Sequence, residues 1–276
     1  MKTKKPASII LAATLFAVAL TVAVDSPIPD NFVRVEGGTF QMGSNSGESD
    51  EKPVHMVTVK SFSISKYEVT QKEWYEVMGT TVRQQRDMAD KSSWHIRGEG
   101  DNYPMYYVNW YKAVEYCNKR SLKEGLTPAY RGSTGNITCD WNTNGYRLPT
   151  EAEWEFAAKG GTKDYLKTDY SGSNSVEAVA WYDGNSKGST HPVGTKAANS
   201  LGIHDMSGNV WEWCWDWYGA YASGSQTDPR GAISGDDRVI RGGSWGDMAE
   251  DVRSAYRYFI DPYDGDFNFG FRLVRN

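Results

Sequence analysis

The sequence predicts an α+β fold with few helices, short strands and many loops, and three observations predict it. Among 276 residues, 28 Gly, 17 Tyr and 11 Trp favour tight turns and aromatic packing over long regular helices. Helix-capping signals mark only three segments, all before Gly161. After Gly161 the tryptophans stand among loops and short strands, with no internal repeat or low-complexity linker. We therefore expect one domain over residues 24–276.

Three segments have the period of a strand. Residues 33–40 and 55–60 alternate apolar and polar side chains between glycine-rich or charged breaks. Residues 43–52 between them are predicted to form an exposed turn. Between residues 211 and 217 every second residue is a tryptophan, so in a strand these rings would share one face, turned to the core.

Each predicted helix begins at a capping residue. Thr70 with Glu73, and Thr150 with Glu153, have the spacing of a capping box, in which both side chains accept hydrogen bonds from backbone amides of the first turn. Asn109 is the cap of the remaining helix, whose apolar face includes a cysteine. The three helices are predicted to end at Gly79, Gly125 and Gly160–Gly161.

The N-terminal segment is typical of a secretory signal. Three lysines within the first five residues precede an apolar run, residues 7–19, and small residues at 21–23 form a cleavage site. A membrane-spanning helix needs about 18 or more apolar residues, which favours a cleaved signal over an anchor. We therefore expect residues 1–23 to be removed and the protein to be exported and extracytoplasmic, with the cell surface as one location that fits.

Composition argues against several function classes. The net charge is -5, and no Lys/Arg cluster occurs beyond the first five residues, which argues against nucleic acid as a partner. The three cysteines, Cys117, Cys139 and Cys214, allow at most one disulfide, and their spacing matches no zinc pattern.

Residues 242–246 fit the G-x-S-x-G pattern of hydrolase nucleophile elbows. In such enzymes a histidine follows the serine in the chain, whereas the last histidine here is His204. A glycine-rich turn that closes a strand explains these residues better.

Residues 205–212 combine two carboxylates, an amide and a glycine turn. Calcium is bound by carboxylate and backbone oxygens in compact loops of this kind. By spacing alone a solvated acidic loop explains the segment equally well.

Several segments, in order, resemble the formylglycine-generating-enzyme family, also called the sulfatase-modifying-factor domain. The resemblance covers almost the whole mature chain and implies a C-type-lectin-like fold of the formylglycine-generating-enzyme type. The matching segments are FVRVEGGTFQMGS (32–44), YEVTQKEW (67–74), GYRLPTEAEWEFAAKGG (145–161), HPVG (191–194), GIHDMSGNVWEW (202–213), RVIRGGSW (238–245) and GFRLVRN (270–276).

The resemblance also implies which metals to expect. Enzymes of this family bind copper through two cysteine thiolates between the GGS and GFR segments, the first near Asp247 here. Residues 245–270 contain no cysteine, and carboxylates are poor ligands for Cu(I), so we expect no copper and no enzyme activity. A family calcium site spans the GNVWEW segment. Carried over by position, its ligands are the side chains of Asp205 and Glu212 and the carbonyls of Gly208 and Val210.

A closer resemblance is to the variable proteins of diversity-generating retroelements, the treponemal ones in particular. Their variable region lies between GGSW-like and GFRL-like segments, here about residues 245–270. Adenine-directed mutagenesis of AAY codons reaches every residue type except Trp, Lys, Glu, Gln and Met. The candidate ligand-binding positions all carry reachable types: Gly246, Asp247, Asp251, Tyr256, Tyr258, Phe259, Ile260, Asp261, Tyr263, Asp264, Gly265, Asp266 and Asn268.

The composition of this region independently favours a binding surface. It is rich in Tyr, Phe, Asp and Gly without a regular period, and Tyr supplies stiff contact area while Gly and Asp adapt the backbone, as in antibody loops. The alternative is an aromatic end loop packed on the domain. We expect Tyr256, Tyr258, Phe259, Tyr263, Asp247, Asp251, Asp261, Asp264 and Asp266 to be exposed, and Arg253, Ala255, Arg257 and Pro262 to belong to the framework.

The sequence thus favours a non-catalytic, receptor-type protein that binds a protein or cell-surface molecule through this region. The second hypothesis is a structural or accessory exported protein with the same fold and a fixed partner.

Overall fold

The computed structural model describes residues 1–2, 29–163 and 167–276. Nearly all of the predicted signal segment, residues 1–23, lies outside the described residues. Within these ranges, no helix combines the length and the apolar character needed to cross a bilayer.

The sheet that carries the C-terminal region has four strands. β7 (Trp211–Trp217) pairs antiparallel with β9 (Arg238–Arg241), and β9 pairs antiparallel with β10 (Arg257–Ile260). On the other side of β7 lies the parallel strand β11 (Phe269–Gly270). The order β10-β9-β7-β11 places β10 at the edge of the sheet.

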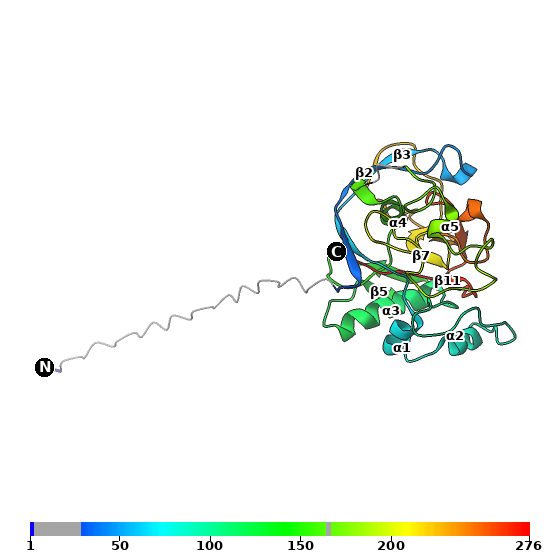
Figure 1. Cartoon of the computed structure of the whole chain (residues 1–276). Coiled ribbons are helices and arrows are strands. Elements are labelled where there is room, and N and C mark those ends of the chain that lie inside the picture. Colours follow the sequence, from blue (N-terminus) through cyan, green and yellow to red (C-terminus); the bar gives the residue numbers. More distant parts are fainter. Residues whose placement is uncertain (3–28, 164–166) are drawn as a thin grey trace.

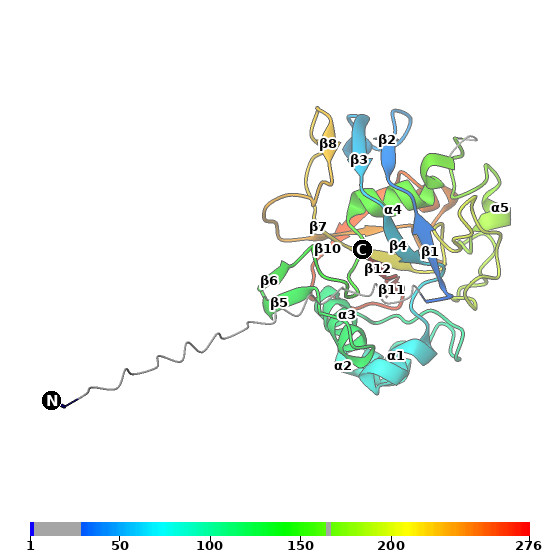
Figure 2. The ribbon, with the colours of Figure 1, turned by 90° about the vertical axis from the view of Figure 1, so that its left-hand side faces the viewer.

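The remaining strands of the described ranges form smaller sheets. β2, β3 and β8 lie side by side at the top of Figure 2, and β1, β4 and β12 lie beside α4. The bounds are β1 Phe32–Val35, β4 Phe62–Ser65 and β12 Val274–Arg275 in one sheet; β2 Gly38–Met42, β3 His55–Val59 and β8 Gln226–Thr227 in the second; and β5 Tyr130–Ser133 with β6 Asn136–Cys139 in a hairpin.

The three predicted helices are confirmed. In each, the capping residue accepts a hydrogen bond from a backbone amide of the first turn, and α1 ends at Gly79 in the left-handed conformation (φ 71°). These helices are α1 (Gln71–Met78), α3 (Trp110–Lys123) and α4 (Glu151–Ala158).

Two α-helices and three short 3-10 turns were not predicted. α2 (Val82–Met88) begins at a capping box of Thr81 and Gln84 but has almost no apolar periodicity, which hid it. The expected exposed turn 43–52 is partly wrong, because it contains a 3-10 turn whose Glu51 is fully buried. The other elements are α5 (Val176–Val179), η1 (Ser49–Glu51), η2 (Gly161–Lys163) and η3 (Ala249–Val252).

β7 separates two hydrophobic clusters. Trp213 lies on the α3 side, where its Nε1 donates to the Val108 carbonyl at 2.7 Å, whereas Cys214 lies on the α4 side. Figures 1 and 2 both show α4 above β7 and α3 below it. The alternation of tryptophans in β7 therefore fits its packing between two helices.

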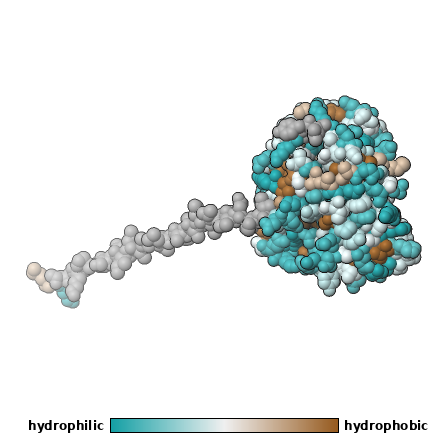
Figure 3. Space-filling model, viewed as in Figure 1, coloured by the Kyte–Doolittle hydropathy of each residue, from teal (hydrophilic) through white to brown (hydrophobic). Residues whose placement is uncertain are grey.

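The apolar surfaces of these elements face inward. On the face shown in Figure 3, hydrophilic residues prevail and hydrophobic ones form small, separate patches. The predicted turn after β9 is present, and a Cβ on Gly243 would lie 2.6 Å from Val252 Cγ1, so the GGS segment needs glycine there. Ser244 belongs to this turn, as expected.

Candidate ligand-binding surface

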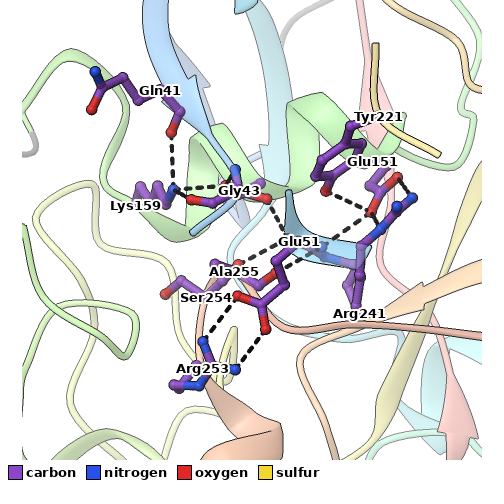
Figure 4. Close-up of polar contacts among 12 residues, drawn as sticks. Gln41, Gly43, Glu51, Glu151, Lys159, Tyr221, Arg241, Arg253, Ser254 and Ala255 are labelled. Carbon is purple, nitrogen blue, oxygen red and sulfur yellow. Dashed lines mark hydrogen bonds and ion pairs between the residues drawn. The ribbon is translucent and has the colours of Figure 1, made fainter. Parts of the chain in front are cut away.

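Three arginines, two of them buried and one half-buried, fix the C-terminal region to the scaffold. Arg257, in β10, donates to both oxygens of Glu151 at the start of α4, at 2.8 and 2.7 Å. Arg253 pairs in the same two-point manner with Glu51, and Arg241 also reaches Glu151, at 3.1 Å (Figure 4). Arg253 and Arg257, which were expected to belong to the framework, thus contact the scaffold, and Ala255 and Pro262 are buried. That these four positions stay constant remains a prediction.

The exposure of the predicted ligand-binding residues falls into three classes. Exposed rings are Tyr258 (45%), Phe259 (37%) and Tyr263 (59%), which agrees with the expectation for these residues. Ligand binding by any of these positions stays a prediction. Gly246, Asp261 and Asp264 are also exposed; Asp247, Asp251, Tyr256, Ile260, Asp266 and Asn268 are half-buried; and Gly265 is buried.

Four residues that were expected to be exposed are half-buried instead: Asp247, Asp251, Tyr256 and Asp266. Tyr256 packs 6.1 Å from the Trp211 ring, and burial raises the pKa of its hydroxyl. The carboxylates of Asp247, Asp251 and Asp266 turn back to accept backbone amides of their own loops, which removes them from full exposure.

A side chain at Gly265 would be crowded. A Cβ there would lie 3.0 Å from the Tyr107 carbonyl oxygen and 3.2 Å from the Asn109 amide nitrogen. Because these contacts are to backbone atoms, a side chain would require the neighbouring backbone to shift, so we expect Gly265 to vary less than the exposed positions.

Four aromatic rings form a continuous row, which we call the aromatic row: Trp211, Tyr258, Phe259 and Tyr218. Successive ring centroids lie 5.8, 5.5 and 4.1 Å apart. Trp211 is buried and supports the row from β7, while Tyr258 and Phe259 present their rings to solvent from the edge strand. Tyr218, which the sequence did not single out, completes the row.

A polar group lies at the position where the resemblance places the first copper-binding cysteine. Ser244 Oγ donates to Asp247, and Asn268 Nδ2 donates to Ser244 Oγ at 3.1 Å. Burial raises the pKa of the Asp247 carboxyl. The last cysteine of the chain, Cys214, lies buried in β7, where burial raises the pKa of its thiol.

A second aromatic cluster adjoins this group. Phe267 packs between Trp245 and Trp94, with centroid distances of 5.5 and 5.4 Å, and the Arg97 guanidinium lies over the Trp245 ring at 5.5 Å. Residues 94–97 are remote in sequence from the C-terminal region, so no local pattern could have revealed this contact.

The predicted calcium ligands lie in the loop before β7 and at its start. Glu212 accepts hydrogen bonds from Arg272 at 2.6 Å on each oxygen and from Trp154 Nε1 at 2.7 Å. Asp205 accepts a hydrogen bond from the Gly194 amide at 2.6 Å and none from an arginine of the described residues, so it is the more available of the two carboxylates. The residues expected to offer carbonyls, Gly208 and Val210, are buried in the same loop.

A third buried carboxylate, Glu68, lies near Asp205 and Glu212. It lies in the YEVT segment, the one sequence signal that could have identified it, and it accepts Asn209 Nδ2 at 3.0 Å. Burial, then the charges of Asp205 and Glu212, raise the pKa of Glu68, and burial raises the pKa of Asp205 to about 6. Three carboxylates thus face the Arg272 guanidinium, an excess of negative charge that fits a cation or bound protons.

Side chains alone do not form a metal cage. Among the described residues, no group of three or more His, Cys, Asp or Glu side chains could hold a metal ion. A calcium ion here would therefore need backbone carbonyls as well as Asp205, as the resemblance implies.

Comparisons with known proteins identify the family and the fold. The model of the sulfatase-modifying factor enzyme 1-like domain matches residues 21–276. Among solved structures, Treponema denticola variable protein 1 superposes with a TM-score of 0.78 and 34% identity, over 88% of this chain and 94% of that one. The predicted α+β, C-type-lectin-like fold and the resemblance are confirmed.

Two curated relatives differ in their described roles. The "Chaperone protein LppX" of Paenibacillus barcinonensis is 36% identical over 97% of both chains. The "Inactive C-alpha-formylglycine-generating enzyme 2" of Bos taurus is 31% identical, over 88% of this chain and 87% of that one. Close relatives thus include proteins that are not described as active enzymes.

Proposed function

We propose that this chain, which belongs to the sulfatase-modifying factor enzyme 1-like domain family, is a non-catalytic, receptor-type ligand-binding protein. Its binding surface is the C-terminal region, residues 246–268. The observation that carries the proposal is the pairing of exposed rings on Tyr258, Phe259 and Tyr263 with buried ion pairs that hold the same segment to the scaffold. Such exposed apolar patches usually mark interaction sites.

Similarity to a treponemal variable protein supports this reading. At 34% identity and a TM-score of 0.78, the likeness extends over most of both chains. A protein that varies at its surface needs a core that tolerates the variation, and the Arg257–Glu151 pair supplies a buried anchor independent of the exposed residues. We propose a protein or a cell-surface molecule as the ligand.

The cysteine content supports the absence of catalysis. No cysteine follows Cys214 in the chain, and the resemblance places the first copper ligand near Asp247. We expect no conversion when the purified protein is incubated with Cu(I) and a cysteine-containing sulfatase peptide. Copper-dependent conversion that is lost in a Cys214→Ser variant would overturn the non-catalytic proposal.

We also propose export, from the N-terminal signal, and calcium binding near Asp205. Export predicts that the extracytoplasmic protein begins near Val24, which N-terminal sequencing of the mature protein would establish. A mature protein that retains Met1 would contradict it.

A second candidate is an accessory exported protein with a fixed partner. The 36% identity to a protein described as a chaperone, over 97% of both chains, favours it specifically. The two candidates differ in one property, because a fixed partner requires the sequence of residues 246–268 to stay constant among cells of one population.

A further inference from the structure

We infer that the outer edge of β10, with the aromatic row beside it, binds an extended, lysine- or arginine-rich segment of a protein partner. The inference rests on the proposed function and adds the chemistry of the ligand for this particular sequence. Three features carry it: an unpaired strand edge, exposed rings on that strand, and unpaired carboxylates at its end.

The edge of β10 is free to pair. Within the described ranges, β10 has one strand neighbour, β9, with Tyr258 opposite Ile240 and Phe259 opposite Val239. Apart from the pairing with β9, the backbone of residues 258–260 forms no hydrogen bond with another described segment. Extended peptides bind such edges by adding a strand, with main-chain hydrogen bonds giving affinity and side chains giving specificity.

The rings on this strand suit a cationic side chain. Tyr258 and Phe259 stack on each other at 5.5 Å with an interplanar angle of 22°, and both remain more than a third exposed. Lys and Arg side chains bind aromatic faces with their cations and cover them with their alkyl stems. Because neighbouring rings of the aromatic row cover faces of Tyr258 and Phe259, the exposed parts of these rings suit the alkyl stem of a basic side chain, whose cation can reach the carboxylates at the end of the strand.

The charge next to the strand selects the same partner. Asp237 precedes β9 and Asp261 follows β10, so the register of Arg238 with Ile260 brings them to the same end of the sheet. Burial, then Asp261, Asp236 and Asp264, raise the pKa of the Asp237 carboxyl. None of these four carboxylates forms an ion pair with another described residue.

The strand arginines do not neutralise this charge. Arg257 turns inward to Glu151, and Arg238 is buried between the rings of Trp217 and Trp110, at 3.4 and 3.8 Å. The surface therefore attracts cations and repels nucleic acid or an acidic peptide. An uncharged apolar segment would gain binding free energy from contact with the rings but none from attraction to the carboxylates.

The test uses the full mature protein and two synthetic peptides, one of alternating lysine and valine and one of alternating glutamate and valine. Fluorescence anisotropy measures their affinities at low and at physiological salt. The lysine peptide is expected to bind, more tightly at low salt, and the glutamate peptide is not.

Variants assign the binding to this edge. Tyr258→Ser with Phe259→Ser is expected to weaken lysine-peptide binding about tenfold or more, and Asp261→Asn with Asp264→Asn about threefold to tenfold with a smaller salt dependence. Tyr75→Ser with Glu76→Gln, an exposed ring and carboxylate on α1, is the matched control and should change affinity less than about twofold.

Each contrary result overturns the inference. These results are absent binding of the lysine peptide, equal binding of the glutamate peptide, and an affinity unchanged by both edge variants. Failure here leaves the proposed function standing, because that depends on variation at residues 246–268 and not on the charge of one ligand.

Discussion

Arg257 and Glu151 form a two-point ion pair directly beneath the exposed edge of the sheet, with Nε 2.8 Å from Oε1 and Nη2 2.7 Å from Oε2. Arg257 points inward from β10, and the next residue, Tyr258, points outward. β10 thus carries a buried anchor next to an exposed ring, and the ion pair joins β10 to the first turn of α4. Changes at Tyr258 leave this anchor untouched.

Breaking the anchor should destabilise the fold. We expect Arg257→Ala to lower the free energy of unfolding by about 3 to 5 kcal/mol, because Glu151 then loses a buried partner. Urea unfolding measures this change. Arg83→Ala, which removes the exposed pair with Glu99, is the control and should change the free energy of unfolding far less than Arg257→Ala does. Equal effects of the two substitutions would contradict the anchoring role.

Exposed rings should be replaceable one at a time. We expect Tyr258→Ser, Phe259→Ser and Tyr263→Ser each to change the free energy of unfolding by no more than about 0.5 kcal/mol, as surface substitutions usually do. Trp245→Ala, which empties a buried site beside Phe267, should cost about 3 to 5 kcal/mol. Unfolded Ser variants would show that these rings belong to the core.

Calcium should stabilise the protein through Asp205. We expect added Ca²⁺ to raise the Tm of chelator-treated protein. At a free Ca²⁺ concentration of a hundred times the Kd, the free energy of unfolding should increase by about 2.7 kcal/mol. Asp205→Asn should abolish this response without lowering the stability of the calcium-free protein, since it removes one of three crowded carboxylates. Identical melting of the wild-type protein with and without Ca²⁺ would instead mean that bound protons neutralise the cluster.

Stability should fall as pH rises, because of Asp216. Burial, then the charge of Glu151, raise the pKa of this carboxyl to about 8, well above its ordinary value of 3.8. Between these two pKa values the folded protein binds more protons than the unfolded chain, so the free energy of unfolding decreases with increasing pH. The loss above about pH 6 separates Asp216 from Asp205, whose pKa is about 6, and an Asp216 variant is needed to separate it from Glu68, whose pKa is also raised.

Urea unfolding at about pH 6 and pH 8 measures that loss. In Asp216→Asn, which keeps the shape of the side chain but cannot ionise, the difference between the two pH values should shrink. A variant with the same pH dependence as the wild-type protein would show that another group titrates.

Local signals in the sequence predicted the elements that local chemistry determines. The capping box of Thr150 and Glu153 identified α4, and the glycines after β9 identified a turn. The resemblance supplied the fold class, and the residue types between GGSW and GFRL supplied the exposed rings. These inferences needed no knowledge of which distant segments meet.

Contacts between distant segments account for what was missed. Glu51 reads as part of a polar turn, yet it is buried because its partner, Arg253, lies 202 residues away in the chain. Gly265 is typical of a flexible loop residue in the sequence, but the backbone of Tyr107 lies 3.0 Å from where its Cβ would be, so a side chain there would be crowded. Tyr256 resembles its exposed neighbours in sequence but is half-buried, with the Trp211 ring 6.1 Å and the Arg253 guanidinium 5.7 Å from its ring centroid.

The most direct test of the central claim, a binding surface that varies on a constant scaffold, is sequencing of the gene's 3′ end in many cells of one population. The account predicts a nearby near-copy of this coding end that differs at adenines. It also predicts substitutions at the codons for Tyr258, Phe259 and Tyr263, with Gly265 and Arg257 constant. Identical 3′ ends in every cell, with no near-copy in the locus, would contradict it.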